Sequence, residues 1–179
     1  MKKILKLSKY DVVKKQLEVA IKLYFNDDDP ISIHTLTCAA HGILSDLNKK
    51  NNGKPMIISD SLIADRYKIE WNKRLRKPQN FFKHADRDTT EKIDFVPDIT
   101  QHFLFDAIVK YHELTNEIIM GYFLIYKSWF MAKNIIFFNI SEKDKALTRE
   151  ISAKYGDNRK LFFNDMLYVT EIYKKYTIQ

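Results

Sequence analysis

Apolar residues recur at three- and four-residue spacing along most of this chain. Val13, Leu17, Ile21 and Tyr24 follow that spacing, and a period near 3.6 residues is typical of an amphipathic α-helix. The pattern predicts helices over residues 10–25, 30–47, 61–68, 69–85, 97–115, 117–133, 142–154 and 160–175. We therefore expect an all-α protein in which six to eight helices form a single-domain bundle over residues 1–179, with no internal boundary.

Cap and breaker residues explain several of these boundaries. Asp29 followed by Pro30 is a typical helix start, because aspartate caps free backbone N–H groups and proline fits the first helical position. Pro78 falls inside an otherwise helical pattern and should kink or split that helix. Residues 89–96 read as a loop or a short extended piece. The segment 117–133 is apolar almost all round, which predicts a helix that is buried on several sides.

Composition narrows the class of protein further. A chain of 179 residues with 45% apolar content can bury one ordinary core. Only four glycines and four prolines argue against a turn-rich β-sandwich and against a glycine-rich nucleotide-binding loop. A single cysteine excludes an intrachain disulfide framework and a zinc module built from several cysteines.

The chain has no strong membrane or export signal. Its most apolar stretch, residues 118–131, contains Lys127 and is shorter than the roughly 20 apolar residues that span a bilayer. No apolar stretch of secretory length precedes Lys14 and Lys15. These features predict a cytoplasmic protein without a membrane partner.

Net charge suggests a class of partner. The formal charge is +7 and the pI is near 9.3, which favours nucleic acid, a nucleotide or another acidic surface. The excess comes from 24 lysines and only 6 arginines. Arginine forks onto phosphates, whereas lysine is also a general solubilising residue. A lysine-rich soluble surface therefore remains the alternative interpretation.

One polar stripe falls on the 30–47 helix. At 100° per residue, His34, Cys38, His41 and Ser45 share a narrow strip away from the apolar face. Imidazole and thiol groups can bind zinc or iron. However, the spacing is not a common zinc pattern, and one cysteine does not close such a site. The stripe can instead meet another layer of the bundle, with His34 bonded to a loop carbonyl and Cys38 as a small buried hydrophobic residue. We favour this interpretation and predict no cofactor.

A second polar constellation lies at the end of the 69–85 helix. Its members are Arg76, Asn80, Lys83, His84, Asp86, Arg87 and Asp88. If the helix continues through them, the cations and Asn80 share one face that can grip a phosphate, and His84 is a candidate general acid or base. The aspartates can orient His84 or bind a divalent ion. The alternative is an ordinary helix C-terminus, where basic side chains interact favourably with the helix dipole.

Acidic and histidine side chains also follow the 97–115 helix. His102, Asp106 and Glu113 fall along one side of it. A His–Asp pair one turn apart is a possible ligand pair, but no second helix is matched to it. We interpret this side as a solvated face.

Two segments resemble a known family. Residues 29–36 (DPISIHTL) and 80–88 (NFFKHADRD) resemble the signature segments of a family of uncharacterised bacterial all-helical proteins, and the resemblance extends loosely from Val13 to Leu114. Thr89 stands where that family has proline. The resemblance implies a helical fold and brings no activity with it.

A fainter similarity is to HEPN-type helical domains. Some of these domains are metal-independent ribonucleases that use an arginine and a histidine separated by four to six residues. Here Arg76 and His84 are separated by seven residues. The similarity therefore does not extend to that catalytic pattern.

These observations leave three functional hypotheses. The favoured one is a non-enzymatic, self-associating helical module whose residues 80–88 contact a phosphate-bearing or acidic partner. The second is a metal-independent nuclease with His84 as base and Arg76 and Arg87 at the phosphate. The third is a helical metalloprotein that uses His34, His41 and His84 with Asp86 or Asp88. We favour the first because no nucleophile is paired with a base at a defined spacing.

Overall fold

The computed structural model describes residues 4–54, 56, 65–84 and 89–177. In these residues it contains α1 (Lys9–Phe25), α2 (Pro30–Lys50), α3 (Asp65–Phe81), α4 (Ile99–Thr115), α5 (Tyr122–Lys133), the short 3-10 turn η2 (Ile135–Phe137), α6 (Glu142–Tyr155) and α7 (Arg159–Thr177). Helices cover 72% of the described residues, and none of those residues is in a strand. The all-α bundle predicted from periodicity is confirmed.

Side-chain caps fix where three helices begin. Ser8 and Asp11 form a reciprocal capping box at α1, in which each side chain accepts a hydrogen bond from the other's backbone N–H. Asp29 accepts hydrogen bonds from backbone N–H groups of the first turn of α2, as the Asp-Pro pair predicts. Ser141 caps α6 through the backbone N–H of Asp144. These caps satisfy N–H groups that have no partner inside their own helix.

The helix expected over residues 117–133 is shorter than predicted. Asn116 adopts a left-handed conformation with φ 55° and ends α4. Gly121 then takes φ 57° and ψ −131°, a conformation that side-chain-bearing residues rarely adopt, and α5 begins after it. Residues 117–121 are therefore a connecting segment, although their apolar side chains continue the pattern of α5.

Two further boundaries differ from the expectation. Pro78 lies inside α3 and does not split it, because the helix begins at Asp65 and continues to Phe81. The sequence pattern predicted a helix as far as residue 85, but α3 ends at Phe81. The expected helix over 61–68 falls partly outside the described residues. The segment 89–96 is a loop, as expected.

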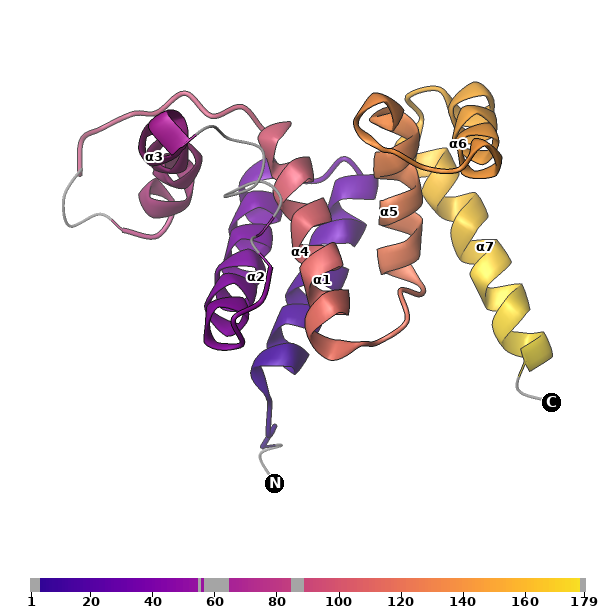
Figure 1. Cartoon of the computed structure of the whole chain (residues 1–179), viewed down its shortest axis with the longest axis horizontal. Helices are drawn as coiled ribbons and strands as arrows, with labels where there is room; N and C mark the ends of the chain where they lie inside the picture. Colours follow the sequence, from indigo (N-terminus) through magenta and orange to yellow (C-terminus); the bar gives the residue numbers. More distant parts are fainter. Residues whose placement is uncertain (1–3, 55, 57–64, 85–88, 178–179) are drawn as a thin grey trace.

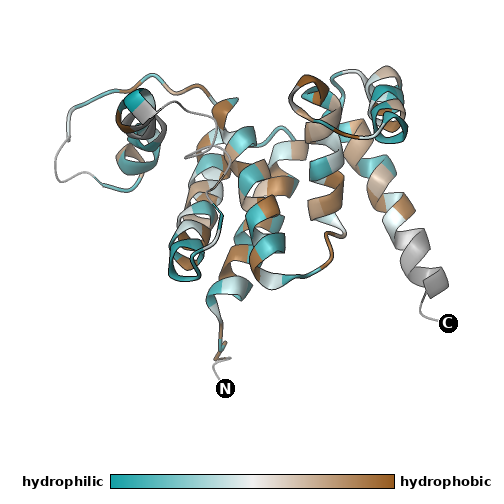
Figure 2. Cartoon of the chain, in the orientation of Figure 1, coloured by the Kyte–Doolittle hydropathy of each residue, from teal (hydrophilic) through white to brown (hydrophobic). Residues whose placement is uncertain are grey.

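The core of the bundle lies around α1. This helix packs against α2, α4, α5 and α7 (Figure 1), and α5 in turn packs against α1, α4, α6 and α7. Figure 2 shows apolar residues gathered on α4 and α5. Aromatic rings fill the centre: Phe25 stacks on Phe163 with 4.6 Å between ring centroids and meets Trp129 edge-on. Burial of such rings is a main source of stability in a bundle.

In contrast, α3 lies at the edge of the molecule (Figure 1) and makes its main contact with α2. In the described part of the chain, every helix is too short or too polar to cross a bilayer.

Candidate functional site

The predicted stripe on α2 faces α4 and forms a buried polar seam between the two helices. Its members are His34, Thr37, Cys38, His41 and Asn48 from α2 with Thr100, Asp106 and Lys110 from α4. The expectation that this stripe meets another layer of the bundle is therefore correct. Buried polar groups in a helix interface are costly unless they are paired, so the pairing decides what the seam can do.

His34 is fully buried at the upper end of the seam. Its Nδ1 lies 2.9 Å from Oγ1 of Thr100, and the rings of Phe82, Phe95 and Phe103 surround it with centroids 5.0–6.2 Å away. Burial lowers the pKa of His34 to about 4, and the nearby positive charge of Lys83 acts in the same direction. The imidazole is therefore neutral at physiological pH.

Cys38 lies one turn further along α2 and contacts the same imidazole. Its Sγ is 3.4 Å from Nε2 of His34. Burial raises the pKa of Cys38 to about 12. A thiol in this state is a poor nucleophile and a poor metal ligand, because both roles need the thiolate.

The seam continues with an ionisable pair. Nε2 of His41 lies 3.0 Å from Oδ2 of Asp106, and the Asp106 side chain is only 1% exposed. The expectation that this side of α4 is solvated is wrong at Asp106, which α2 covers, whereas Glu113 is exposed. Half-buried His102 lies edge-on to the ring of Phe130 instead.

Lys110 ends the seam. Its side chain is 3% exposed and donates hydrogen bonds to the backbone oxygen of Lys54 at 2.8 Å and to Glu113 at 2.6 Å. Asn48 donates to the same oxygen at 2.9 Å. These bonds tie the loop after α2 to α4.

The seam has little capacity for chemistry. Within the described residues, no three His, Cys, Asp or Glu side chains come close enough to hold a metal ion. His34 and His41 each have a partner across the helix interface. The pattern is that of a specific helix–helix contact, in which the His34–Thr100 and His41–Asp106 pairs set the register of α2 against α4. The buried hydroxyl of Thr37 has no hydrogen-bond partner in the described residues.

The second predicted constellation begins on α3 but does not form one helical face. After Phe81 the chain turns, and the backbone N–H groups of Lys83 and His84 both donate to the carbonyl oxygen of Asn80. The ring of Phe82 packs against His34 and Phe95 instead of continuing the helix. The helix does not continue through Phe82, Lys83 and His84, because α3 ends at Phe81.

The structure places only part of the predicted set. Arg76, Asn80, Lys83 and His84 are all exposed at the end of α3. Asp86, Arg87 and Asp88 lie outside the described residues. The placed members share the exposed end of α3 beside the seam, and Gln79 connects them to it by donating to the backbone oxygen of Cys38 at 3.4 Å.

Sequence reasoning missed how strongly basic α3 is. This helix carries six basic residues and two acidic ones, and three of the six arginines in the chain lie on it. The basic residues are Arg66, Lys68, Lys73, Arg74, Arg76 and Lys77. The whole-chain lysine excess hides this local concentration, whereas a count of arginine by segment would have found it.

Comparison of the chain with protein-family models, with curated proteins and with solved structures finds no match. The resemblances of residues 29–36 and 80–88 to bacterial helical proteins, and the fainter one to HEPN-type domains, therefore stay expectations.

Proposed function

We propose that this protein is a non-enzymatic binding module that contacts the phosphates of nucleic acid through α3 and residues 80–84. The observation that carries the proposal is a run of exposed, unpaired cations on a helix outside the core. Arg76, Lys77 and Lys83 are exposed, and none has a side-chain partner in the described residues.

Several cations of the bundle are placed differently. Lys14 pairs with Glu117 at 2.9 Å, and Lys110 pairs with Glu113. Lys133 pairs with Asp157 at 2.7 Å. A paired lysine is partly neutralised, whereas an unpaired one is free to replace the counterions of a phosphate backbone. Arg76, Lys77 and Lys83 are thus better suited to an anionic partner than these paired lysines.

The site favours binding over catalysis. His84 is exposed, and in the described residues no carboxylate or hydroxyl group is bonded to its ring. A general base normally has such an orienting partner. The remaining histidines of interest, His34 and His41, are paired with Thr100 and Asp106 inside the seam.

The proposal can be tested by titrating labelled single-stranded RNA and duplex DNA at low salt. We expect the triple variant Arg76→Ala, Lys77→Ala, Lys83→Ala to bind about 10-fold more weakly than the wild type, because phosphate contacts dominate such affinities. The matched control is Lys143→Ala, Arg149→Ala, Lys160→Ala, which removes one arginine and two lysines that are also exposed. Equal losses in the two variants, or no binding by the wild type, would refute the proposal.

A second arm of the same experiment separates binding from cleavage. We expect His84→Ala to keep most of the wild-type affinity, because the proposal assigns the phosphate contacts to Arg76, Lys77 and Lys83. The RNA should also stay intact after long incubation with the wild type. Cleavage that disappears in His84→Ala would instead identify a nuclease.

A further inference from the structure

A cavity lies away from α3 and from the polar seam. It is a groove of about 670 Å³ between α1, residues 117–121, the start of α5, and α7. Its apolar lining includes Ile119, Phe123 and Leu167. A groove of this size and character can bury several apolar side chains.

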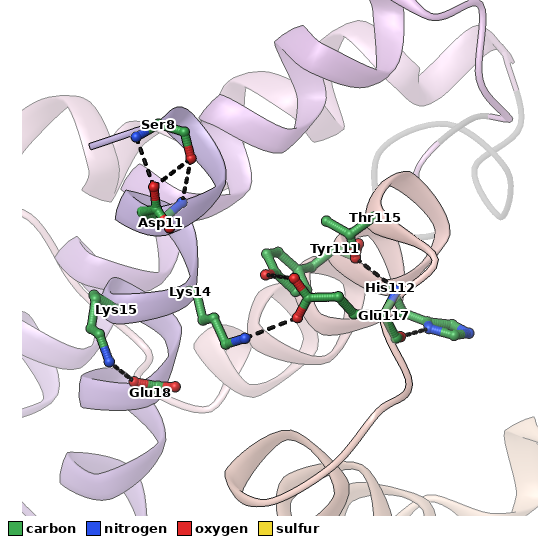
Figure 3. Close-up of polar contacts among 9 residues, drawn as sticks. All are labelled: Ser8, Asp11, Lys14, Lys15, Glu18, Tyr111, His112, Thr115 and Glu117. Atoms are coloured by element: carbon green, nitrogen blue, oxygen red, sulfur yellow. Dashed lines mark hydrogen bonds and ion pairs between the residues drawn. The ribbon is translucent and has the colours of Figure 1, made fainter. Parts of the chain in front are cut away.

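Residues 117–121 form a fixed wall of this groove. Glu117 accepts hydrogen bonds from the hydroxyl of Tyr111 at 3.0 Å and from Nζ of Lys14 at 2.9 Å (Figure 3), and its backbone oxygen contacts the ring of His112. The wall is therefore tied to both α1 and α4. It does not depend on a ligand for its position.

The apolar side chains and the backbone polar groups of this wall lack partners. The side chains of Ile118 and Met120 are 80% and 65% exposed. Among the described residues, the backbone N–H and C=O groups of residues 118–120 have no hydrogen-bond partner. Apolar side chains next to unpaired backbone resemble an exposed strand edge, which is a common place for another chain to add.

The N-terminal arm, residues 4–7, has matching properties. Ile4, Leu5 and Leu7 are 86%, 64% and 60% exposed, and the arm lies outside any helix or turn. No backbone hydrogen bond involves it in the described residues. Figure 2 shows the arm and the segment before α5 as two separate apolar stretches at the surface.

We propose that the arm of one copy of this chain lies in the groove of a second copy and pairs with residues 118–120. In an extended segment, Leu5 and Leu7 point to the same side and can enter the groove together. Lys6 then points away from the groove floor toward solvent. The pairing buries exposed apolar side chains of both copies. It also gives hydrogen-bond partners to the unpaired backbone groups of the arm and of residues 118–120.

The cap of α1 argues for a second copy rather than the chain's own groove. The Ser8–Asp11 capping box holds Ser8 in an extended conformation (φ −81°, ψ 168°) that carries the arm away from α1. The groove lies beside Lys14 and Glu18, further along the same helix. An arm in its own groove would have to reverse at Ser8 and break the capping box. Exchange between two copies keeps the cap and closes a two-fold dimer with two equal contacts.

Sedimentation velocity over a concentration series tests the proposal. We expect the wild type to dimerise and the variant Leu5→Asp, Leu7→Asp to remain monomeric with unchanged helix content, because these side chains have no role in the core. The matched control is Ile136→Asp, since Ile136 is 84% exposed and lies on η2, away from the groove. A monomeric wild type, a dimer that survives in the arm variant, or a control that also dissociates would overturn the proposal.

Disulfide trapping identifies which copy supplies the arm. We expect Leu5→Cys mixed with Ile118→Cys to form a disulfide between copies on mild oxidation, and Leu5→Cys mixed with Ile136→Cys to form much less. The native Cys38 is buried and does not compete. A double variant Leu5→Cys, Ile118→Cys that closes its disulfide within a monomer would show that the arm occupies its own groove, and would overturn the proposal.

Discussion

The aromatic core around Phe25 and the basic helix α3 represent two opposite uses of the same chain. In the core, Phe25 is fully buried among the rings of five other aromatic residues. The described side chains of α3 are exposed or half-exposed, and Ile69 is 85% exposed. They belong to residues 66, 67, 69, 70 and 76–81. The rings that fill the core and the exposed cations of α3 are therefore on different helices.

The same contrast separates individual lysines. Lys110 is buried with two partners, and its charge is used to hold α4 against the loop after α2. Lys77 is exposed without a partner and contributes little to folding. Net charge alone does not distinguish these two roles. Burial and pairing do.

The largest expected effect is in the core. We expect Phe25→Ala to lower the free energy of unfolding by about 3–5 kcal/mol, because it leaves a cavity among stacked rings. Denaturant titration measures this loss. A loss below about 1 kcal/mol would mean that the core repacks around the missing ring. The aromatic core would then contribute less to stability, relative to α3, than the structure indicates.

A slightly smaller effect is expected in the seam. Asp106→Ala removes the partner of His41 from a buried site, and we expect it to cost about 3 kcal/mol. The double variant His41→Leu, Asp106→Leu should recover much of this loss, because an apolar pair leaves no buried charge. If the double variant is as unstable as the single one, the pair does not act as a unit.

Acid should destabilise the seam through His34. Its pKa is about 4 in the folded protein and near 6.5 in an unfolded chain. Between these values the unfolded chain binds a proton that the folded protein excludes, so stability falls as pH drops from about 6.5 to about 4, by at most about 1.4 kcal/mol per pH unit. The difference between wild type and His34→Gln in denaturant titrations across this range isolates the effect. Parallel curves would contradict it.

The smallest effect on stability is expected where α3 meets the seam. Phe82 contacts His34 and Phe95, whereas Phe81 contacts only Phe82 among the described rings. Both are half-buried. We expect Phe82→Ala to cost about 1–2 kcal/mol and Phe81→Ala about half of that. The reverse order in denaturant titrations would mean that Phe81, and not Phe82, anchors the end of α3 to the bundle.

Local pattern was enough to predict most of the fold. The 3.6-residue periodicity and the caps at Ser8 and Asp29 located α1 and the start of α2 within a residue or two. Residues 117–121 could not be separated from α5, because their apolar side chains continue its pattern. The break depends on the backbone at Asn116 and Gly121.

The candidate site was less predictable because it depends on contacts between distant segments. The stripe of His34 and His41 was visible on one helix, but its partners Thr100 and Asp106 are 66 and 65 residues away in sequence. Asp106 was expected on a solvated face because the sequence does not show that α2 covers this side of α4. Periodicity shows that a helix has a polar side and does not show which helix covers it.

The salt dependence of RNA binding tests most directly that α3 is the phosphate-binding surface. The logarithm of the binding constant falls linearly with the logarithm of the salt concentration, with a slope of about −0.7 for each phosphate contact to a single strand. We expect the slope for Arg76→Ala, Lys77→Ala, Lys83→Ala to be shallower than that of the wild type by about 2. The control Lys143→Ala, Arg149→Ala, Lys160→Ala has the same net charge and should keep the wild-type slope. Equal slopes for the two triple variants would contradict the assignment. RNA binding would then depend on the total positive charge of the protein and not on the cations of α3.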